Sequence, residues 1–346
     1  MEKELRLMKG NEAVAEAAIR AGADGYFGYP ITPQSEILEY LMAARPWETT
    51  GMVVLQAESE VASINMLYGG AGTGKMVMTS SSSPARSGAE LPCLIVNVVR
   101  GGPGLGTIQP AQSDYFQAVK GGGHGDYHLI VLAPASVQEM ADFVDLAFEL
   151  AFKYRNPAMI LSDGAIGQMM EKVWLGPQKE RSKTVPDWAT TGKPASRERN
   201  IITSLDLDPD AQEIFNQKLI AKYDEIREKE VRYEEFQCED AEYLFVAYGT
   251  SARVCMKSVQ IARAAGMKVG LLRPITLFPF PSKRLRQLAD KVKMMLSVEM
   301  SAGQMIEDVL LSVNGKVPVY HFGRMGGIVT APEEVVEYLK SKILGG

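Results

Sequence analysis

The chain has 346 residues, which is enough for two domains of ordinary size and a linker between them. Hydrophobic residues make up 46% of the chain and charged residues 23%, which excludes collagen-like, disordered and disulfide-scaffold proteins. The net charge of −5, with acids and bases interspersed, argues against nucleic acid as the main partner. Apolar runs such as 93–99 are too short to span a bilayer, and the charged N-terminal segment MEKE predicts no signal peptide.

Three cysteines, Cys93, Cys238 and Cys255, are scattered along the chain, and no C-x-x-C pair occurs. An odd and scattered set predicts unpaired thiols in a reducing cytoplasm. These cysteines cannot supply the full set of thiolates that an iron–sulfur cluster needs. Any iron–sulfur chemistry must therefore reside on another polypeptide.

Residues 1–178 alternate helical and extended hydrophobic patterns. Short, fully apolar strands separated by helices are typical of a doubly wound parallel sheet that is buried on both faces. The expected helices cover 12–21, 34–44, 60–68 and 136–154, and the expected strands cover 26–29, 52–55, 76–80, 93–99, 129–132 and 158–161.

Residues 179–238 differ in composition and predict a linker followed by a helical arm. The first part is polar and contains Pro186 and Pro194, which favours an extended segment. Residues 208–235 predict a charged amphipathic helix whose acids and lysines form a solvated face. Its apolar stripe is expected to consist of Ile214, Leu219, Tyr223 and Ile226.

Residues 239–346 predict a second, smaller α/β domain. From Ala241 the alternation resumes in four βα units, with Ser251 and Ser282 as candidate N-caps of two helices. The expected strands cover 244–248, 269–272, 295–298 and 317–321.

The glycine-rich segment 69–75, GGAGTGK, fits the first seven positions of a nucleotide-binding P-loop. The eighth position, however, is Met76, where a P-loop has Ser or Thr to bind magnesium. The order of elements is also reversed, because a P-loop runs from a strand into a helix and here a helix precedes a strand. We therefore expect these glycines to end a helix and turn the chain.

The connection 81–92 between two expected neighbouring strands lacks any helical pattern. Parallel strands need a crossover of about a dozen residues or more, and that crossover is usually helical. Either this crossover is irregular, or the chain lacks a segment that its architecture normally carries.

Four motifs stand out along the first half of the chain: YPITP at 29–33, ESEVAS at 58–63, TSSSSP at 79–84 and VRGGP at 99–103. Taken together they resemble those of the 2-oxoacid:ferredoxin oxidoreductases, specifically the subunit with the pyrimidine-binding domain of thiamine diphosphate. The stretches 100–114 and 120–127 (KGGGHGDY) are most similar to the 2-oxoisovalerate type.

The resemblance covers nearly the whole chain and implies a fold. It implies a thiamine-diphosphate-binding, doubly wound parallel-sheet domain over 1–178 and a transketolase C-terminal-like domain over 239–346. The implied reaction is oxidative decarboxylation of a branched-chain 2-oxo acid with CoA, which gives acyl-CoA, carbon dioxide and reduced ferredoxin. A thiamine-dependent carboligase of the transketolase or acetolactate synthase type and a P-loop protein are the alternatives.

The resemblance implies that Glu60 holds the N1′ atom of the cofactor's aminopyrimidine ring. Thiamine diphosphate needs a carboxyl group there to become reactive, and the cofactor then performs the carbanion chemistry. Glu58, two residues earlier, is the competing candidate. Glu60 could instead be a first-turn acid that is favoured by the helix dipole.

Thr32, Pro30 and Arg100 complete the implied site. By resemblance Pro30 and Thr32 contact the cofactor, and the Thr32 hydroxyl binds the 2-oxo acid, although Thr32 could also cap the helix 34–44. Arg100 ends an apolar strand, and its guanidinium can hold the substrate carboxylate by a bidentate pair, or it could pair with a neighbouring acid. The resemblance therefore assigns the catalytic roles to Glu60, Arg100 and Thr32.

No Gly-Asp-Gly segment, the usual motif for the pyrophosphate and its metal, occurs in the chain, and the closest segments are 125–127 and 162–164. We assign no metal site, since His124 and His128 around Asp126 are more typical of a solvated loop. The resemblance therefore implies that a partner subunit binds the pyrophosphate with Mg²⁺ and that other subunits carry [4Fe-4S] clusters.

The surface around Thr32, Glu60 and Arg100 is accordingly expected to be an apolar, obligate interface. After the TSSSSP motif the family has a glycine and a helix, and here ARSG at 85–88 stands in their place. The absence of this helix leaves open that the chain is only a scaffolding subunit.

Overall fold

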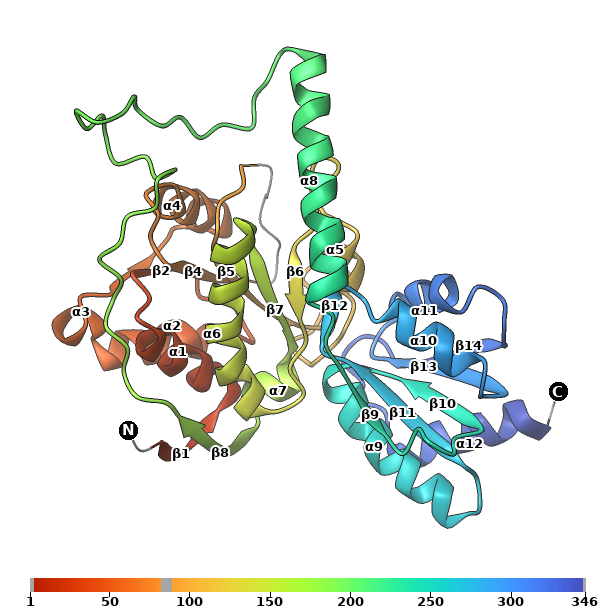
Figure 1. The fold of residues 1–346 in the computed structure, drawn as a ribbon. Helices are drawn as coiled ribbons and strands as arrows, with labels where there is room; N and C mark the ends of the chain where they lie inside the picture. The colour runs from red at the N-terminus through yellow and green to blue at the C-terminus, as the bar shows by residue number, and fades with distance from the viewer. Residues whose placement is uncertain (1–2, 82–88, 345–346) are drawn as a thin grey trace.

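The computed structural model describes residues 3–81 and 89–344. Two α/β units lie side by side, joined by an extended segment and a long helix that projects beyond both (Figure 1). Among the helices of these described residues, none combines the length and apolarity needed to cross a membrane.

The first unit is built on a seven-stranded sheet whose strands are parallel except for one edge strand. This confirms the doubly wound parallel sheet predicted from the alternating pattern. In spatial order its strands are β12 (Thr276–Phe278), β6 (Ile130–Leu132), β7 (Ala158–Asp163), β5 (Leu94–Val99), β4 (Val77–Ser81), β2 (Gly25–Gly28) and β3 (Val53–Gln56).

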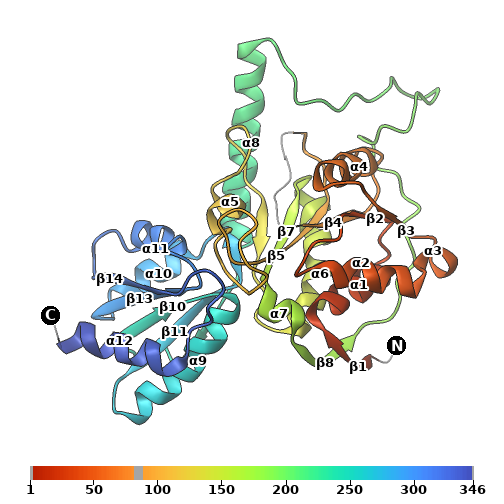
Figure 2. The same cartoon turned by 180° about the vertical axis from the view of Figure 1, so that it is seen from behind.

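Helices cover both faces of this sheet. Helix α1 packs against both α2 and α6, whereas α4 lies on the opposite side of β2 and β4 (Figures 1 and 2). The helices of this unit are α1 (Gly10–Ala21), α2 (Ser35–Ala44), α3 (Pro46–Thr49), α4 (Glu60–Gly72), α5 (Tyr115–Val119), α6 (Val137–Tyr154) and α7 (Gly164–Gln168).

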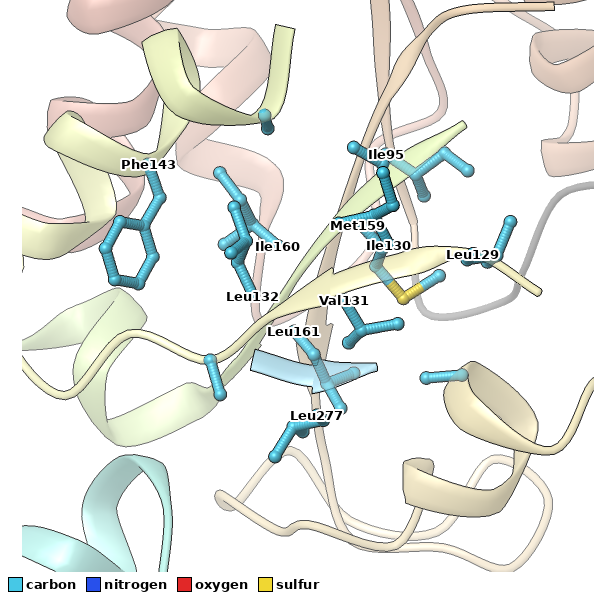
Figure 3. Packing of buried hydrophobic residues seen from close by; sticks show 14 of the residues in the cluster. Ile95, Leu129, Ile130, Val131, Leu132, Phe143, Met159, Ile160, Leu161 and Leu277 are labelled. Atoms are coloured by element: carbon cyan, nitrogen blue, oxygen red, sulfur yellow. The ribbon is translucent and has the colours of Figure 1, made fainter. Parts of the chain in front are cut away.

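The core lies in the middle of the sheet, where β4, β5 and β7 are buried along their whole length. Continuous Val, Ile and Leu runs such as 94–99 suit strands that are covered on both faces. In Figure 3 Ile95 of β5 packs near Met159 of β7, and Leu277 of β12 lies in the same cluster.

Two features of the first unit were not predicted from the sequence. Strands β1 (Glu4–Lys9) and β8 (Met170–Leu175) form an antiparallel pair that joins the two ends of the unit. Strand β12 follows β11 in the chain, yet it pairs with β6 of the first sheet. The second half of the chain therefore contributes a strand to the first sheet.

The glycine-rich segment 69–75 lies at the end of α4 and is followed by β4. The expected order of helix, turn and strand is confirmed, although Gly69–Gly72 still belong to the helix instead of following it. The Lys75 ammonium lies 3.7 Å from the Asp24 carboxylate. Lys75 thus pairs with an acid of the same unit, and the segment does not have the geometry of a P-loop.

The linker is extended, and it is attached to the first unit. The Arg181 guanidinium forms an ion pair with Asp24 and donates a hydrogen bond of 2.6 Å to the Gly51 carbonyl oxygen. Farther along, the Thr190 hydroxyl donates a hydrogen bond of 2.9 Å to the Gly72 carbonyl oxygen. These contacts explain how a polar, proline-containing segment keeps a defined path.

Helix α8 (Pro209–Lys229) is the predicted arm, with two corrections. Leu219, Tyr223 and Ile226 are buried as expected, but Ile214 is 68% exposed because the N-terminal half of the helix projects away from the body (Figure 1). The helix also ends before 235, since 233–236 pairs with β11 as strand β9.

The second unit has a five-stranded sheet in the order β14, β13, β10, β11, β9. The four predicted βα strands pair in parallel, and β9 adds an antiparallel edge. The elements are β9 (Tyr233–Phe236), β10 (Tyr243–Val246), α9 (Gly249–Ala264), β11 (Val269–Pro274), α10 (Ser282–Ala289), β13 (Met294–Glu299), α11 (Met305–Val313), β14 (Val319–Gly323) and α12 (Pro332–Leu344).

The two predicted N-caps of this unit are wrong. Helix α9 begins at Gly249, so Ser251 lies inside its first turn, and Ser282 is the first residue of α10 after Pro281. One of the free N–H groups at the start of α9, that of Thr250, is instead bound by Asp163 of the first unit, whose carboxylate accepts a hydrogen bond of 3.2 Å.

The connection between β4 and β5 contains residues 82–88, which lie outside the described residues. The expectation of an irregular crossover there, and of a missing helix, stays a prediction.

Candidate active site

Strands β3, β2, β4 and β5 lie next to one another and run parallel, so that their carboxyl ends meet at one edge of the sheet. Ligands in open α/β sheets collect at this edge. Glu60 follows β3, Thr32 follows β2 and Arg100 directly follows β5. The topology therefore carries all three predicted residues to the same edge.

Thr32 and Arg100 touch directly. The Nη1 atom of Arg100 donates a hydrogen bond of 2.9 Å to the carbonyl oxygen of Thr32. Among the described residues no acid forms an ion pair with Arg100, which disfavours the alternative of an arginine that pairs with a neighbouring acid. The rest of its guanidinium is available to bind an anion.

A chain of hydrogen bonds beneath Thr32 fixes the loop that carries it. The buried Tyr26 hydroxyl lies 2.6 Å from Ser80 Oγ, which in turn donates to Gln34 Oε1. The Nε2 atom of Gln34 donates a hydrogen bond of 2.9 Å to the Tyr29 carbonyl oxygen. Burial raises the pKa of Tyr26 to about 12, so its hydroxyl stays protonated as a donor. A Cβ at Gly28 would lie 2.1 Å from that hydroxyl, which explains the glycine there.

The other side of the same loop is held from α1 and α7. The Pro33 carbonyl oxygen accepts hydrogen bonds from Asn11 Nδ2 at 2.7 Å and from Gln168 Nε2 at 3.0 Å. Helix α2 begins at Ser35 with Gln34 at its N-cap position and no side-chain cap. Thr32 therefore does not cap that helix, and the exposed Thr32 side chain is free for another role.

Glu60 is the first residue of α4, and its position is set by Ser59, whose Oγ accepts a hydrogen bond of 3.2 Å from the Ala62 N–H group. Glu60 is half-buried and Glu58 is exposed. Within the described part of the chain neither carboxylate has a hydrogen bond or an ion pair. A half-buried carboxylate without a partner, at a helix start on the ligand edge of a sheet, fits a group that binds a ring nitrogen.

The acidic residue of the 162–164 segment has a structural role. Asp163 is buried, and its Oδ1 accepts hydrogen bonds from the Ala165 and Ile166 N–H groups and from the Thr250 hydroxyl. Burial raises the pKa of Asp163, and these donors oppose the shift. Asp163 therefore joins the two units and starts α7, which leaves it no freedom to act as a metal ligand.

His128 also packs inside the structure instead of facing a ligand. Its ring stacks on Phe278 with 4.2 Å between the ring centroids, and it meets Tyr223 of α8 edge-on. Burial, together with the nearby Arg227, lowers the pKa of His128. Since its ring joins β12 to α8, the expectation of a solvated loop histidine is wrong for His128.

Exposed apolar side chains lie on the strand before Glu60 and on the helix that Glu60 begins. Strand β3 is the edge of the sheet, and Val53 and Leu55 on it are exposed. On α4 the side chain of Val61, next to Glu60, is 70% exposed. Exposed apolar groups gathered along one sheet edge and one helix are typical of a protein–protein interface. The surface, here named the β3–α4 surface, consists of Val53, Leu55, Val61, Met66 and Tyr68.

Sequence reasoning missed the residues that hold the site. Gln34 directly follows the YPITP motif, at the start of α2, and Ser80 lies in the TSSSSP motif, at the end of β4. Their places at these motifs are the signal that could have drawn attention to them. Asn11 and Gln168 lie far apart in the sequence and converge only on Pro33, so no local signal points to them.

Two known families match successive parts of the chain. Residues 16–243 match the family described as pyruvate flavodoxin/ferredoxin oxidoreductase, thiamine diphosphate-binding. Residues 241–335 match core domain II of pyruvate:ferredoxin oxidoreductase.

Similar proteins cover nearly the whole chain. Ketoisovalerate oxidoreductase subunit VorB of Methanothermobacter marburgensis is 51% identical, and the match covers 97% of each chain. The 2-oxoglutarate synthase subunit KorA of Archaeoglobus fulgidus is 35% identical over 98% of this chain and 100% of its own.

Solved structures agree with this assignment. A 2-oxoglutarate:ferredoxin oxidoreductase from Magnetococcus marinus is similar with a TM-score of 0.86 and 27% identity, over 99% of this chain and 66% of that chain. A split-gene transketolase shares the fold alone, with a TM-score of 0.57, 13% identity and coverage of 96% of this chain and 93% of that one. The chain therefore belongs to the 2-oxoacid:ferredoxin oxidoreductase family, and it is the subunit of such an enzyme that carries a thiamine diphosphate-binding domain.

Proposed function

We propose that this chain provides the substrate-binding half and the aminopyrimidine half of an active site that oxidatively decarboxylates a branched-chain 2-oxo acid. The observation that carries the proposal is the Arg100 guanidinium, fixed to the Thr32 carbonyl oxygen at 2.9 Å, at the same sheet edge as Glu60. The products would be acyl-CoA, carbon dioxide and reduced ferredoxin.

Arg100 and Thr32 would hold the substrate. A guanidinium presents its donors in a fixed fork that matches a carboxylate, so Arg100 can orient the acid end of the substrate. The Thr32 hydroxyl can donate a hydrogen bond to the 2-oxo group. Because Arg100 is already fixed to Thr32 through one nitrogen, little side-chain freedom is lost when the substrate binds.

Glu60 would hold a proton at the N1′ atom of the bound aminopyrimidine ring, with Pro30 and Thr32 also contacting the cofactor. Thiamine diphosphate supplies the carbanion chemistry when it is bound. The half-buried, unpartnered Glu60 carboxylate fits this role better than Glu58, which is exposed. Both are kept as candidates for the experiment below.

The identity to ketoisovalerate oxidoreductase subunits supports a branched-chain substrate. It reaches 51%, compared with 35% for a 2-oxoglutarate synthase subunit. We therefore take 3-methyl-2-oxobutanoate as the substrate to test first.

Other subunits would complete the enzyme. One would bind the pyrophosphate of thiamine diphosphate with Mg²⁺, since the charged end of the cofactor needs a cation and its ligands. Another would carry the [4Fe-4S] clusters that pass electrons to ferredoxin, because Cys93, Cys238 and Cys255 are buried and unpaired here. We assign the assembly to the reducing cytoplasm on the basis of these free thiols.

The β3–α4 surface would face the subunit that binds pyrophosphate. It is apolar and adjoins Glu60, so a partner there would exclude water from the site at which the cofactor ring lies. The chain alone should then bind thiamine diphosphate weakly and turn over nothing. Calorimetric titration of the single chain with thiamine diphosphate and Mg²⁺ tests this, and micromolar binding would contradict it.

The central experiment uses the complex purified with its partner subunits. It should reduce ferredoxin or a viologen dye when 3-methyl-2-oxobutanoate and CoA are added, and kcat/KM should be lower with 2-oxoglutarate. Formation of a carboligation product without dye reduction would favour the transketolase-like alternative. A complex that assembles and binds cofactor but shows neither activity would indicate a scaffolding subunit.

A further inference from the structure

The segment 100–114, here named the Arg100 loop, leads from β5 to α5 and passes between the two units. Its first part is tightly folded, since the Thr107 N–H group donates a hydrogen bond of 2.7 Å to the Gly101 carbonyl oxygen. Gly106 has a φ of +53°, and a Cβ there would lie 1.7 Å from that same oxygen. The loop therefore has a defined shape behind the substrate-binding arginine.

Gln112 fixes this loop to the second unit. Its side chain is buried, and its Oε1 accepts hydrogen bonds from Ser251 Oγ at 2.7 Å and from the Met300 N–H group at 3.0 Å. Its Nε2 donates to the Tyr248 carbonyl oxygen at 2.8 Å. Its own N–H group donates to the Met300 carbonyl oxygen at 2.9 Å. All four bonds end on the second unit.

The second unit holds the Arg100 loop at two further points. Gln304 Nε2 donates a hydrogen bond of 2.7 Å to the Ser113 carbonyl oxygen, and its Oε1 accepts one of 2.8 Å from the Phe116 N–H group. Near the tip of the loop, the Thr107 hydroxyl donates a hydrogen bond of 3.3 Å to the Gly326 carbonyl oxygen. The loop is thus held to the second unit along most of its length.

We propose that the second unit positions Arg100 for the substrate carboxylate, with Gln112 as the main positioning residue. This inference rests on the proposed function, in which Arg100 binds that carboxylate. The loop folds back on the end of β5, since Pro110 pairs with Arg100 and the Ala111 N–H group donates a hydrogen bond of 3.4 Å to the Val99 carbonyl oxygen. Gln112 follows this pairing directly, and its side-chain bonds all end on the second unit. It acts by holding the backbone from which the arginine projects.

The physical reason is the flexibility of an arginine side chain. Its guanidinium holds bidentate geometry with a carboxylate best when the backbone on both sides of the arginine is fixed, and β5 already fixes the side before Arg100. Residues 101–111 contain four glycines, so this segment owes its shape to its hydrogen bonds and not to a stiff backbone. The buried hydrogen bonds of Gln112 provide a rigid anchor at the far end of that segment.

The test compares two variants of the intact multi-subunit complex. Gln112→Met keeps the side-chain length but removes all three side-chain hydrogen bonds. Thr250→Val removes the bond between the Thr250 hydroxyl and Asp163, which also joins the two units but does not involve the Arg100 loop. Steady-state rates are measured with 3-methyl-2-oxobutanoate and CoA as separately varied substrates.

We expect Gln112→Met to raise the KM of the 2-oxo acid by about tenfold, with kcat changed by less than about threefold, because carboxylate binding is lost equally in the ground and transition states. The KM of CoA should stay within about twofold in both variants, and Thr250→Val should leave the KM of the 2-oxo acid unchanged. Equal effects of both variants on that KM would overturn the inference.

A double-mutant cycle separates this inference from the proposed function. If Gln112 acts through Arg100, the Gln112→Met substitution should add little to the KM increase caused by Arg100→Lys. An unchanged KM in Arg100→Lys would mean that the proposed substrate contact itself is wrong. If Arg100→Lys raises the KM of the 2-oxo acid as expected, and the effects of the two substitutions on that KM are fully additive, only the positioning role of Gln112 is contradicted.

Gln112 is buried, so a second variant guards against misfolding. At a half-buried position of the second unit, Gln304→Met removes one contact to the Arg100 loop, at Ser113, and one to the start of α5, at Phe116. It should raise the KM of the 2-oxo acid by about threefold. An unchanged KM there would count against the inference.

Discussion

The Arg100 guanidinium donates a hydrogen bond of 2.9 Å to the carbonyl oxygen of Thr32 and thereby joins the end of β5 to the loop after β2. Strand β4 lies between these two strands in the sheet, so the contact bridges over its carboxyl end. Two residues 68 positions apart in the chain thus meet where a ligand of the sheet would bind.

Replacing Arg100 should weaken binding of the 2-oxo acid. Arg100→Lys keeps the charge but loses the fork of donors, and we expect the KM to rise about tenfold. Arg100→Ala loses both, and we expect a rise of roughly a hundredfold. Arg199→Ala, at an exposed position without an ion pair, is the control, and a similar effect there would contradict the assignment.

Replacing Glu60 should stop activation of the cofactor without disrupting assembly. Glu60→Gln keeps the shape but removes the carboxyl group that shares a proton with N1′. We expect hydrogen–deuterium exchange at the C2 atom of thiamine diphosphate to slow by about two orders of magnitude or more in the complex. Glu58→Gln is the matched control. If Glu58→Gln slows the exchange and Glu60→Gln does not, the roles of the two acids are reversed.

Glu90 should make the stability of the chain depend on pH. Burial alone would raise its pKa, but hydrogen bonds from Lys218 at 2.7 Å and Lys222 at 2.9 Å lower it below its usual 4.5. A carboxyl group with a lowered folded-state pKa stabilises the protein above its unfolded pKa, and this contribution is lost as pH falls through the folded value. The bonds from Lys218 and Lys222 to Glu90 attach α8 to the first unit.

We expect Glu90→Gln to lower the melting temperature by roughly 2–4 °C at neutral pH. The difference from the unmodified chain should shrink as pH falls from the unfolded pKa of Glu90 through its lowered folded-state pKa, because Glu90 is then protonated in both folded and unfolded chains. Thermal unfolding followed by circular dichroism across this range measures it. Glu213→Gln, an exposed acid on the same helix, is the control, and a difference that persists in acid would contradict the prediction.

A charge on the β3–α4 surface should weaken assembly with the partner subunit. Val61→Glu places a carboxylate at a side chain that is 70% exposed in the single chain, so the fold itself should be unaffected. If this surface faces a partner subunit, burying the new charge should weaken association by at least about tenfold. Leu311→Glu on α11, at a position 69% exposed, is the control. Co-purification of the partner with Val61→Glu at the normal yield would rule out this surface as the interface.

The alternation of apolar strands and helices was sufficient to predict the parallel sheet, because strands buried on both faces have to be apolar throughout. The four βα units of the second half could be predicted from the sequence for the same reason. The motifs that carry Thr32, Glu60 and Arg100 also pointed to the sheet edge, since each follows the end of an apolar strand. In these cases the decisive information is local in the chain.

Contacts between segments far apart in the chain could not be predicted from the sequence. The charged pattern at 208–235 predicted one long helix, but residues 233–236 instead pair with β11, because an edge strand of the second sheet was open to them. Likewise 276–278 forms a strand only because β6 lies beside it. Secondary structure at such positions depends on which partner the fold brings near, and propensity is too weak to decide it.

Motifs and hydrophobic periodicity are properties of short segments, so the family, the type of sheet and the three residues expected at its edge could be read from the chain. The roles of Asn11 and Gln168 at Pro33, and of Gln112 between the Arg100 loop and the second unit, became visible only in the folded structure. A buried amide shows its function only through the donors and acceptors that folding places around it.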